Sequence, residues 1–224
     1  LMEVFAGFLE HTDAQVGKLI DELEHQGLRE NTLVLYVFSD NGASAEGMTG
    51  SIAELNAQNG IPSTPAQHMA LLEREGGLDA LGSARFDSMY HAAWAWAGMA
   101  PLQGTKLLAG HFGGTRVPLA ISWPVRIAPD PAVRPQFHHV NDLAPTLYEL
   151  VGIAAPEVVD GHAQQPLDGI SMSYTFDSAS APTRKASQYF EMLGSRGIFH
   201  QGWMASAWGP RTPWIADPNQ FKGW

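Results

Sequence analysis

The chain opens with a stretch whose apolar residues recur at helical spacing. They are Phe5, Phe8, Leu9, Val16, Leu19, Ile20 and Leu23. Apolar residues three and four positions apart line one face of an α-helix, and most of the charged residues here lie off that stripe. Gly27 follows the last turn and suits the position just beyond a helix C-terminus. The pattern therefore predicts an amphipathic helix that ends before Gly27.

An unbroken apolar run, Leu-Val-Leu-Tyr-Val-Phe, occupies residues 33–38 after a short turn. Continuous runs of this length, rich in β-branched and aromatic residues, are typical of strands buried on both faces of an α/β sheet. Residues 117–123 form a second such run, with Pro118 near its start, where proline is tolerated. We expect both runs to be buried strands. The tetrapeptide Ser39–Gly42 then lies at the carboxyl end of a strand, where open α/β sheets bind their ligands.

The rest of the chain divides into a long irregular stretch, a helix and a set of short strands. Residues 43–90 show little periodicity, and loops of that length are usually functional or inserted. Residues 141–152 predict a helix that Asn141 or Asp142 caps and Gly152 ends. From Ser187 onward, strand-like pieces alternate with glycine-bearing turns. We therefore expect a large part, residues 1–183, and the start of a smaller antiparallel part, residues 184–224.

Composition narrows the possible functions. The 224 residues carry 13 Lys and Arg against 23 Asp and Glu, a net charge of −10, which disfavours a nucleic-acid-binding surface. Hydrophobic residues make up 45%, enough for a core, but no apolar run reaches the roughly 18 residues of a membrane span. The absence of cysteine excludes a disulfide, a thiolate metal site and a cysteine nucleophile within these residues. The oligomeric state stays open.

Asp40 and Asn41 are the candidate metal ligands. They place two oxygen-bearing side chains side by side on a turn at a strand end. A hard cation such as Ca²⁺ takes six to eight oxygen ligands, so this pair could supply only part of the set. The alternative is an Asx turn with Gly42 at the position of positive φ.

Lys106 and His111 are the candidate anion-binding residues. Glycines surround them at positions 104, 110, 113 and 114. Glycine lets backbone approach a ligand closely, and lysine supplies a mobile positive charge. The alternative is a surface lysine on a flexible loop.

Three further groups allow both a functional and a structural interpretation. His138 and His139 could bind a metal, although histidines at such boundaries more often pack and form hydrogen bonds. Several tryptophans could line a pocket for an aryl group or a sugar, but core packing is the simpler interpretation for most of them. They are Trp94, Trp96, Trp203, Trp208 and Trp214. Residues 63–67, Ser-Thr-Pro-Ala-Gln, resemble a Ser/Cys-x-Pro-x-Arg nucleophile motif, and we reject them because Gln67 stands where arginine is required.

Taken in order, these segments resemble the later part of a sulfatase of the arylsulfatase type. The resemblance runs over nearly the whole chain. It is carried by Asn31-Thr-Leu-Val-Leu-Tyr-Val-Phe-Ser-Asp-Asn-Gly-Ala-Ser-Ala-Glu46, Trp94-Ala-Trp96, Thr105-Lys106, His111-Phe-Gly-Gly-Thr-Arg116, Ile121-Ser-Trp-Pro124, His138-His-Val-Asn-Asp-Leu-Ala-Pro-Thr146, Gly152-Ile153, Gln188-Tyr-Phe-Glu-Met192 and Gly202-Trp203.

The resemblance implies an alkaline-phosphatase-like α/β sulfatase fold, of which this chain is the distal part of the large central-sheet domain plus the start of a small antiparallel C-terminal domain. It implies hydrolysis of a small-molecule or carbohydrate sulfate ester by a formylglycine, with a bound Ca²⁺ or Mg²⁺. Asp40 and Asn41 match the family's metal-ligand pair, and Lys106 matches the lysine that contacts sulfate. His111 would bind the sulfate or protonate the leaving oxygen. A periplasmic or secreted location also follows by resemblance.

Two departures from the family pattern leave alternatives open. Phe112 precedes Gly113 and Gly114 where glutamate is commoner, and the resemblance covers only the later part of the family, without the N-terminal part that supplies the formylglycine. We therefore expect the formylglycine upstream of this chain and expect the chain to be a fragment that is inactive alone. A phosphonate monoester hydrolase or phosphodiesterase of the same superfamily is the alternative enzyme, and a non-catalytic binding relative is the alternative outside catalysis.

Overall fold

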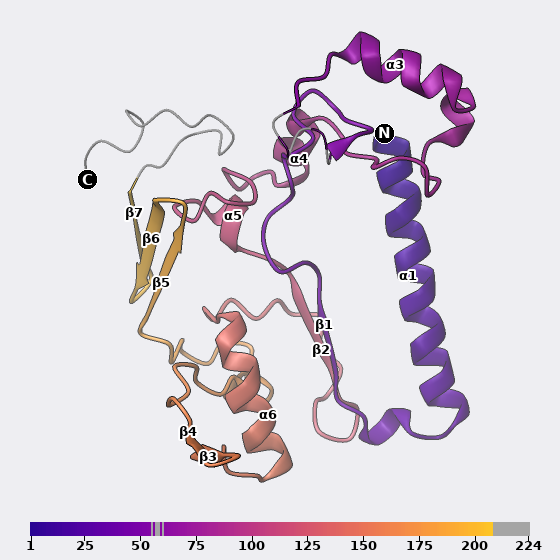
Figure 1. Cartoon of the computed structure of the whole chain (residues 1–224). Coiled ribbons are helices and arrows are strands. Elements are labelled where there is room, and N and C mark those ends of the chain that lie inside the picture. Colours follow the sequence, from indigo (N-terminus) through magenta and orange to yellow (C-terminus); the bar gives the residue numbers. More distant parts are fainter. Residues whose placement is uncertain (55, 57–58, 60, 208–224) are drawn as a thin grey trace.

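The computed structural model describes residues 1–54, 56, 59 and 61–207 (Figure 1). Its α-helices are α1 (Met2–His25), α3 (Pro65–Arg74), α4 (Ala92–Gly98), α5 (Phe112–Thr115) and α6 (Leu143–Val151). Short 3₁₀ turns are η1 (Arg29–Asn31), η2 (Gly77–Ala80), η3 (Val140–Asp142) and η4 (Ser173–Thr175). The strands are β1 (Val34–Val37), β2 (Leu119–Ser122), β3 (Val158–Val159), β4 (His162–Ala163), β5 (Ser187–Met192), β6 (Ser195–His200) and β7 (Trp203–Ala207).

Helix α1 confirms the predicted opening helix and lies at one edge of the molecule (Figure 1). Gly27 follows its C-terminus with φ of +67°, a conformation that glycine adopts without strain. No residue of α1 is buried, and Phe8 and Leu19 are well exposed. Phe5 packs against the ring of Tyr90, with 4.7 Å between centroids. The other apolar residues of the stripe are partly buried, so the described residues cover this face of α1 only in part.

Strands β1 and β2 form at the two predicted places, but the prediction that both are buried on two faces is wrong. They pair antiparallel, with Val34 opposite Ser122 and Val37 opposite Leu119. Val37 and Leu119 are both exposed. Burial on two faces requires elements packed on both sides of a sheet. Within the described part of the chain no third strand joins this ribbon.

Helix α3 lies inside the stretch for which the sequence pattern predicts no element. Thr64 is its N-cap: the Thr64 hydroxyl accepts a hydrogen bond from the Gln67 amide, and the Gln67 side chain accepts one from the Thr64 amide. Pro65 occupies the first helical position, where its missing N–H costs nothing. The rejected nucleophile motif is therefore a capping box.

The predicted helix over residues 141–152 is confirmed as η3 followed by α6, and Gly152 ends it with φ of +68°. The capping prediction is only partly met. Asp142 is the N-cap residue of α6, but its side chain makes no capping hydrogen bond to that helix. The carboxylate faces a buried cluster instead.

The side chain of Asp142 is fully buried and receives four hydrogen bonds. Lys185 Nζ lies 2.8 Å from Oδ1, and His138 Nδ1 lies 3.0 Å from Oδ2. The backbone amides of His139 and Ile170 each donate at 2.9 Å. Burial alone would raise the pKa of Asp142, but the hydrogen bonds from His138, Lys185 and the two amides outweigh it and hold that pKa well below its ordinary value.

His138 and His139 fulfil the structural interpretation. The backbone amide of Arg184 donates to the Tyr174 hydroxyl, which lies 3.1 Å from His138 Nε2. The ionised carboxylate of Asp142 can only accept, so His138 Nδ1 donates to it, while the hydrogen bond between Nε2 and the Tyr174 hydroxyl holds the other side of the ring. His139 caps η3 by accepting from the Asn141 amide. Both histidines form hydrogen bonds at the boundary before α6.

Strands β5, β6 and β7 confirm the predicted antiparallel unit, in sheet order β5-β6-β7. The sheet is attached to the preceding residues: Phe199 stacks on Phe137 with centroids 3.7 Å apart, and the Gly110 amide donates to Ser195 Oγ at 3.0 Å. The boundary between residues 183 and 184 stays a prediction.

Among the described residues, no helix combines the length and apolar character needed to cross a bilayer.

Candidate functional site

The turn after β1 carries Asp40 and Asn41. Ser39 bends the chain with φ of +79°, and its hydroxyl donates to the Asn41 carbonyl at 2.8 Å. The residue with positive φ is thus Ser39 and not Gly42, contrary to the predicted Asx turn. Asp40 is exposed and Asn41 is half-buried. Neither side chain forms a hydrogen bond or ion pair with any described residue, so both oxygens are available to a ligand.

Close backbone contact joins this turn to the loop that carries the other two candidates. The Gly42 amide donates to the Gly114 carbonyl at 3.0 Å, and the Lys106 amide donates to the Ala43 carbonyl at 3.0 Å. A Cβ atom on Gly42 would lie 1.6 Å from the Gly113 carbonyl oxygen. Glycine is therefore required here for space. The two segments that the sequence singled out are held together by their backbones.

This contact predicts a large cost for Gly42→Ala. The added methyl would collide with backbone that cannot move independently, so we expect a loss of about 3 kcal/mol or more in unfolding free energy. Gly17→Ala is the matched control, because Gly17 lies inside α1 with nothing within 4 Å of its Cβ position. That change should stabilise by about 0.5 to 1 kcal/mol through helix propensity. Chemical denaturation measures both, and equal stabilities would contradict the packing argument.

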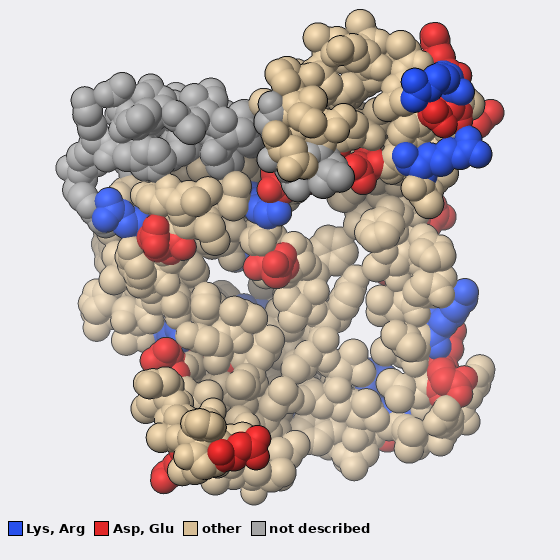
Figure 2. Space-filling view, in the orientation of Figure 1, with Lys and Arg blue, Asp and Glu red and all other residues tan. Residues whose placement is uncertain are grey.

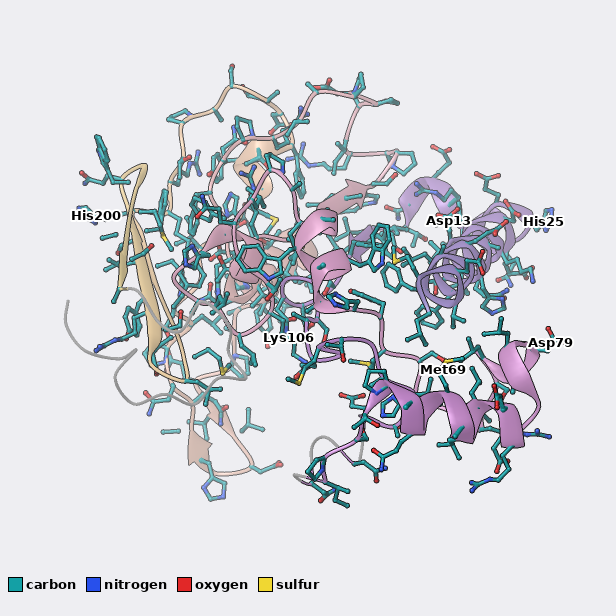
Figure 3. The ribbon with its side chains drawn as sticks, turned by 90° about the horizontal axis from the view of Figure 1, so that it is seen from above. Asp13, His25, Met69, Asp79, Lys106 and His200 are labelled. Atoms are coloured by element: carbon teal, nitrogen blue, oxygen red, sulfur yellow. The ribbon has the colours of Figure 1, made fainter. Side chains whose placement is uncertain are left out.

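Lys106 forms an ion pair with Glu46, a residue that the sequence analysis did not single out as functional. Lys106 Nζ lies 2.8 Å from Glu46 Oε2, and the Ser44 hydroxyl donates to the same oxygen at 2.7 Å. Burial raises the pKa of Glu46, but the hydrogen bonds from Lys106 and Ser44 and the charge of Lys106 leave it below its ordinary value. Figure 3 shows Lys106 near the middle of the molecule, between Asp79 and His200 at opposite sides.

His111 is the N-cap residue of α5, and its side chain makes no capping hydrogen bond to that helix. It is half-buried against Gly104, where a Cβ atom would lie 2.7 Å from His111 Cβ. Burial lowers the pKa of His111. The neutral imidazole is therefore favoured near pH 7, and a neutral imidazole can still donate one hydrogen bond.

Asp40 and Asn41 do not form part of a larger acidic cluster within the described residues. The described residues contain no cluster of three or more His, Asp or Glu side chains that could hold a metal. Asp40 and Asn41 therefore fit a hard cation as part of a ligand set and not as a complete one. On the face in Figure 2, charged residues form small scattered groups on a mostly neutral surface.

The candidate tryptophans within the described residues lie outside the core. Trp94 and Trp96 on α4 and Trp203 on β7 are all exposed, so the core-packing interpretation is wrong for these three. Helix α4 packs instead through Ala92 and Ala95, which contact Ala45. Trp208 and Trp214 lie outside the described residues.

Comparison with known proteins identifies the family of this chain. A model of the Sulfatase family matches residues 1–153. An uncharacterized sulfatase of Schizosaccharomyces pombe is 33% identical over 99% of this chain and 39% of its own length. An arylsulfatase of Klebsiella aerogenes is 28% identical over 87% of this chain and 38% of its own length. Arylsulfatase D of Homo sapiens is 27% identical over 71% of this chain and 20% of its own length. The chain spans about two fifths or less of these relatives.

Proposed function

This chain belongs to the sulfatase family, and we propose that it forms the metal- and sulfate-binding part of an arylsulfatase-type sulfuric ester hydrolase. The observation that carries the proposal is the backbone contact between the turn of Asp40 and Asn41 and the loop of Lys106. Residues of complementary chemistry, oxygen donors and a cation, are thereby fixed on neighbouring segments.

Asp40 and Asn41 are the proposed ligands of a Ca²⁺ or Mg²⁺ ion. Their side-chain oxygens suit a hard cation, and the remaining ligands would come from other groups. When bound, the cation supplies positive charge that offsets the charge on the sulfate oxygens. Ser39 stabilises the conformation of this turn by donating a hydrogen bond to the Asn41 carbonyl.

Lys106 and His111 are the proposed sulfate-binding residues. Lys106 offers N–H donors beyond the one that faces Glu46, and these can bind non-bridging sulfate oxygens. The lowered pKa of His111 favours hydrogen bonding to sulfate over protonation of the leaving oxygen, because little imidazolium is present near neutral pH.

The nucleophile is proposed to be a formylglycine supplied by residues other than these. The chain has no cysteine, and residues 63–67 form the capping box of α3. Residues 122–126, Ser-Trp-Pro-Val-Arg, match the nucleophile motif, but Ser122 pairs with Val34 at the end of the β1–β2 ribbon away from Asp40, and its hydroxyl accepts a hydrogen bond from Arg29. The proposed substrate is a sulfate ester of a small molecule or carbohydrate. Trp94 and Trp96 are exposed on α4, the helix that packs against Ala45, and are compatible with an aryl group.

The test compares 4-nitrophenyl sulfate with 4-nitrophenyl phosphate as substrates of the whole protein. We expect preferred turnover of the sulfate ester, and Lys106→Ala should lower kcat by about 10²-fold, as removal of one donor to a charged transition state does. Arg74→Ala is the control, since Arg74 is an exposed cation on α3 that pairs only with neighbouring Glu75 among the described residues. Preferred phosphate turnover would favour a phosphoryl hydrolase, and no turnover of either would favour a binding protein.

A further inference from the structure

Glu46 lies on a segment that is unusually well fixed. Ala45 is buried against Ala92 and Ala95 of α4. On the other side of Glu46, a Cβ atom on Gly47 would lie 2.1 Å from the Tyr90 carbonyl oxygen. The backbone on both sides of Glu46 is therefore packed without spare room.

The Glu46 side chain is fixed as well. The Ser44 hydroxyl accepts from the Glu46 amide at 3.3 Å and donates to Oε2 at 2.7 Å, so one hydroxyl holds both ends of the residue. This carboxylate oxygen is also the one that Lys106 Nζ contacts at 2.8 Å. Glu46 thus presents a pre-oriented acceptor to a flexible lysine.

The backbone of Lys106 is fixed on the same side. Its amide donates to Ala43, and Thr105 before it is completely buried. The side chain beyond has four rotatable bonds and no rigidity of its own. Among the described residues, Glu46 is the ion-pair partner that defines where Nζ lies.

We propose that Glu46 is the positioning residue of the sulfate-binding lysine. The inference rests on the proposed function and adds a role for a residue that does not itself contact the reacting atoms. One N–H of Lys106 is held by Glu46, which leaves the others aimed at the bound sulfate group. The charge of Lys106 attracts a sulfate group in any conformation of the lysine side chain, whereas stabilisation of the transition state needs Nζ in one position. Loss of Glu46 should therefore reduce kcat and leave KM nearly unchanged.

The test measures kcat, KM and competitive inhibition by inorganic sulfate in the whole protein carrying Glu46→Gln. Glutamine keeps the shape but removes the charge, so we expect kcat to fall about 10-fold, with Glu46→Ala falling further toward about 10²-fold. KM and the inhibition constant for sulfate should stay the same or fall. The melting temperature should not change.

Glu75→Gln is the matched control. Glu75 is paired with Arg74 at 3.0 Å, its side chain is 38% exposed against 34% for Glu46, and its partner has no proposed role. An unchanged kcat in Glu46→Gln, a loss confined to KM, or an equal loss in Glu75→Gln would overturn the inference. If Lys106→Ala leaves both kcat and sulfate inhibition unchanged, the proposed function itself fails. If Lys106→Ala weakens both and Glu46→Gln does nothing, only the role of Glu46 fails.

Discussion

Replacing Lys185 with methionine is expected to lower the unfolding free energy by about 3 to 5 kcal/mol, the usual cost of leaving one member of a buried ion pair without its partner. The ammonium of Lys185 is almost fully buried and contacts Asp142 and Asn141. Its removal leaves the buried carboxylate of Asp142 with hydrogen bonds but without the positive charge of Lys185. Chemical denaturation of the whole protein measures the change.

Asp142→Asn should cost a similar amount, and the double variant should cost less than the sum of the two single changes. Asp130→Asn is the control, because Asp130 pairs with Arg134 at 2.7 Å but at the surface. Surface pairs contribute at most about 1 kcal/mol. If the losses in unfolding free energy of the two single variants simply add in the double variant, the buried cluster is not a source of stability. The same conclusion holds if Asp130→Asn loses as much unfolding free energy as Asp142→Asn.

Asp142 also predicts the direction of a pH effect. Its pKa is lowered in the folded protein, so the unfolded chain binds its proton more readily. The stabilisation is complete above the ordinary aspartate pKa of 3.8 and is lost as the pH falls below it toward the folded value. Denaturation between pH 2 and 6 should therefore show a steeper decline in the parent protein than in Asp142→Asn.

Asp40→Ala is expected to reduce turnover of a sulfate ester by about 10³-fold or more, since a Lewis-acidic ion contributes several kcal/mol to transition-state stabilisation. The proposed carboxylate ligand is exposed and forms no ion pair with any described residue, so its loss should not unfold the protein. Calorimetry with Ca²⁺ should show weaker binding in the same variant. Asp40→Asn retains an oxygen donor without the charge and should lie between the parent and Asp40→Ala.

Asp79→Ala is the control for this change. Asp79 is also exposed but lies on η2, at the side of the molecule away from Lys106 (Figure 3). Unchanged Ca²⁺ affinity in Asp40→Ala, or an equal loss in Asp79→Ala, would contradict the metal assignment.

The elements that the sequence predicts well are those with local signals. Gly27 and Gly152 mark two helix ends, and glycine-bearing turns separate β5, β6 and β7. Helix α3 lies outside the predicted elements although Thr64 and Gln67 form a capping box, because the same residues also resemble a nucleophile motif.

Properties that depend on distant residues were not predictable from the sequence. Burial of residues 33–38 depends on what packs on either face, so a strand-like composition predicted β1 but not its exposure. Glu46 and Lys106 are separated by 60 positions, and no short-range pattern pairs them. The approach of Gly42 to Gly113 is visible only once both segments are folded.

The β1–β2 ribbon has a consequence for how the protein folds. Its last hydrogen bond, from the Phe38 amide to the Pro118 carbonyl, closes a loop that contains Asp40, Lys106 and His111. Pairing of residues so far apart in sequence first costs the entropy of closing the loop, and only afterwards do the new contacts stabilise it. Such pairings are therefore slow to form. The candidate site residues thus lie within the long loop that the β1–β2 ribbon closes. Formation of the site is therefore coupled kinetically to formation of this ribbon, although no side chain of the site is part of it.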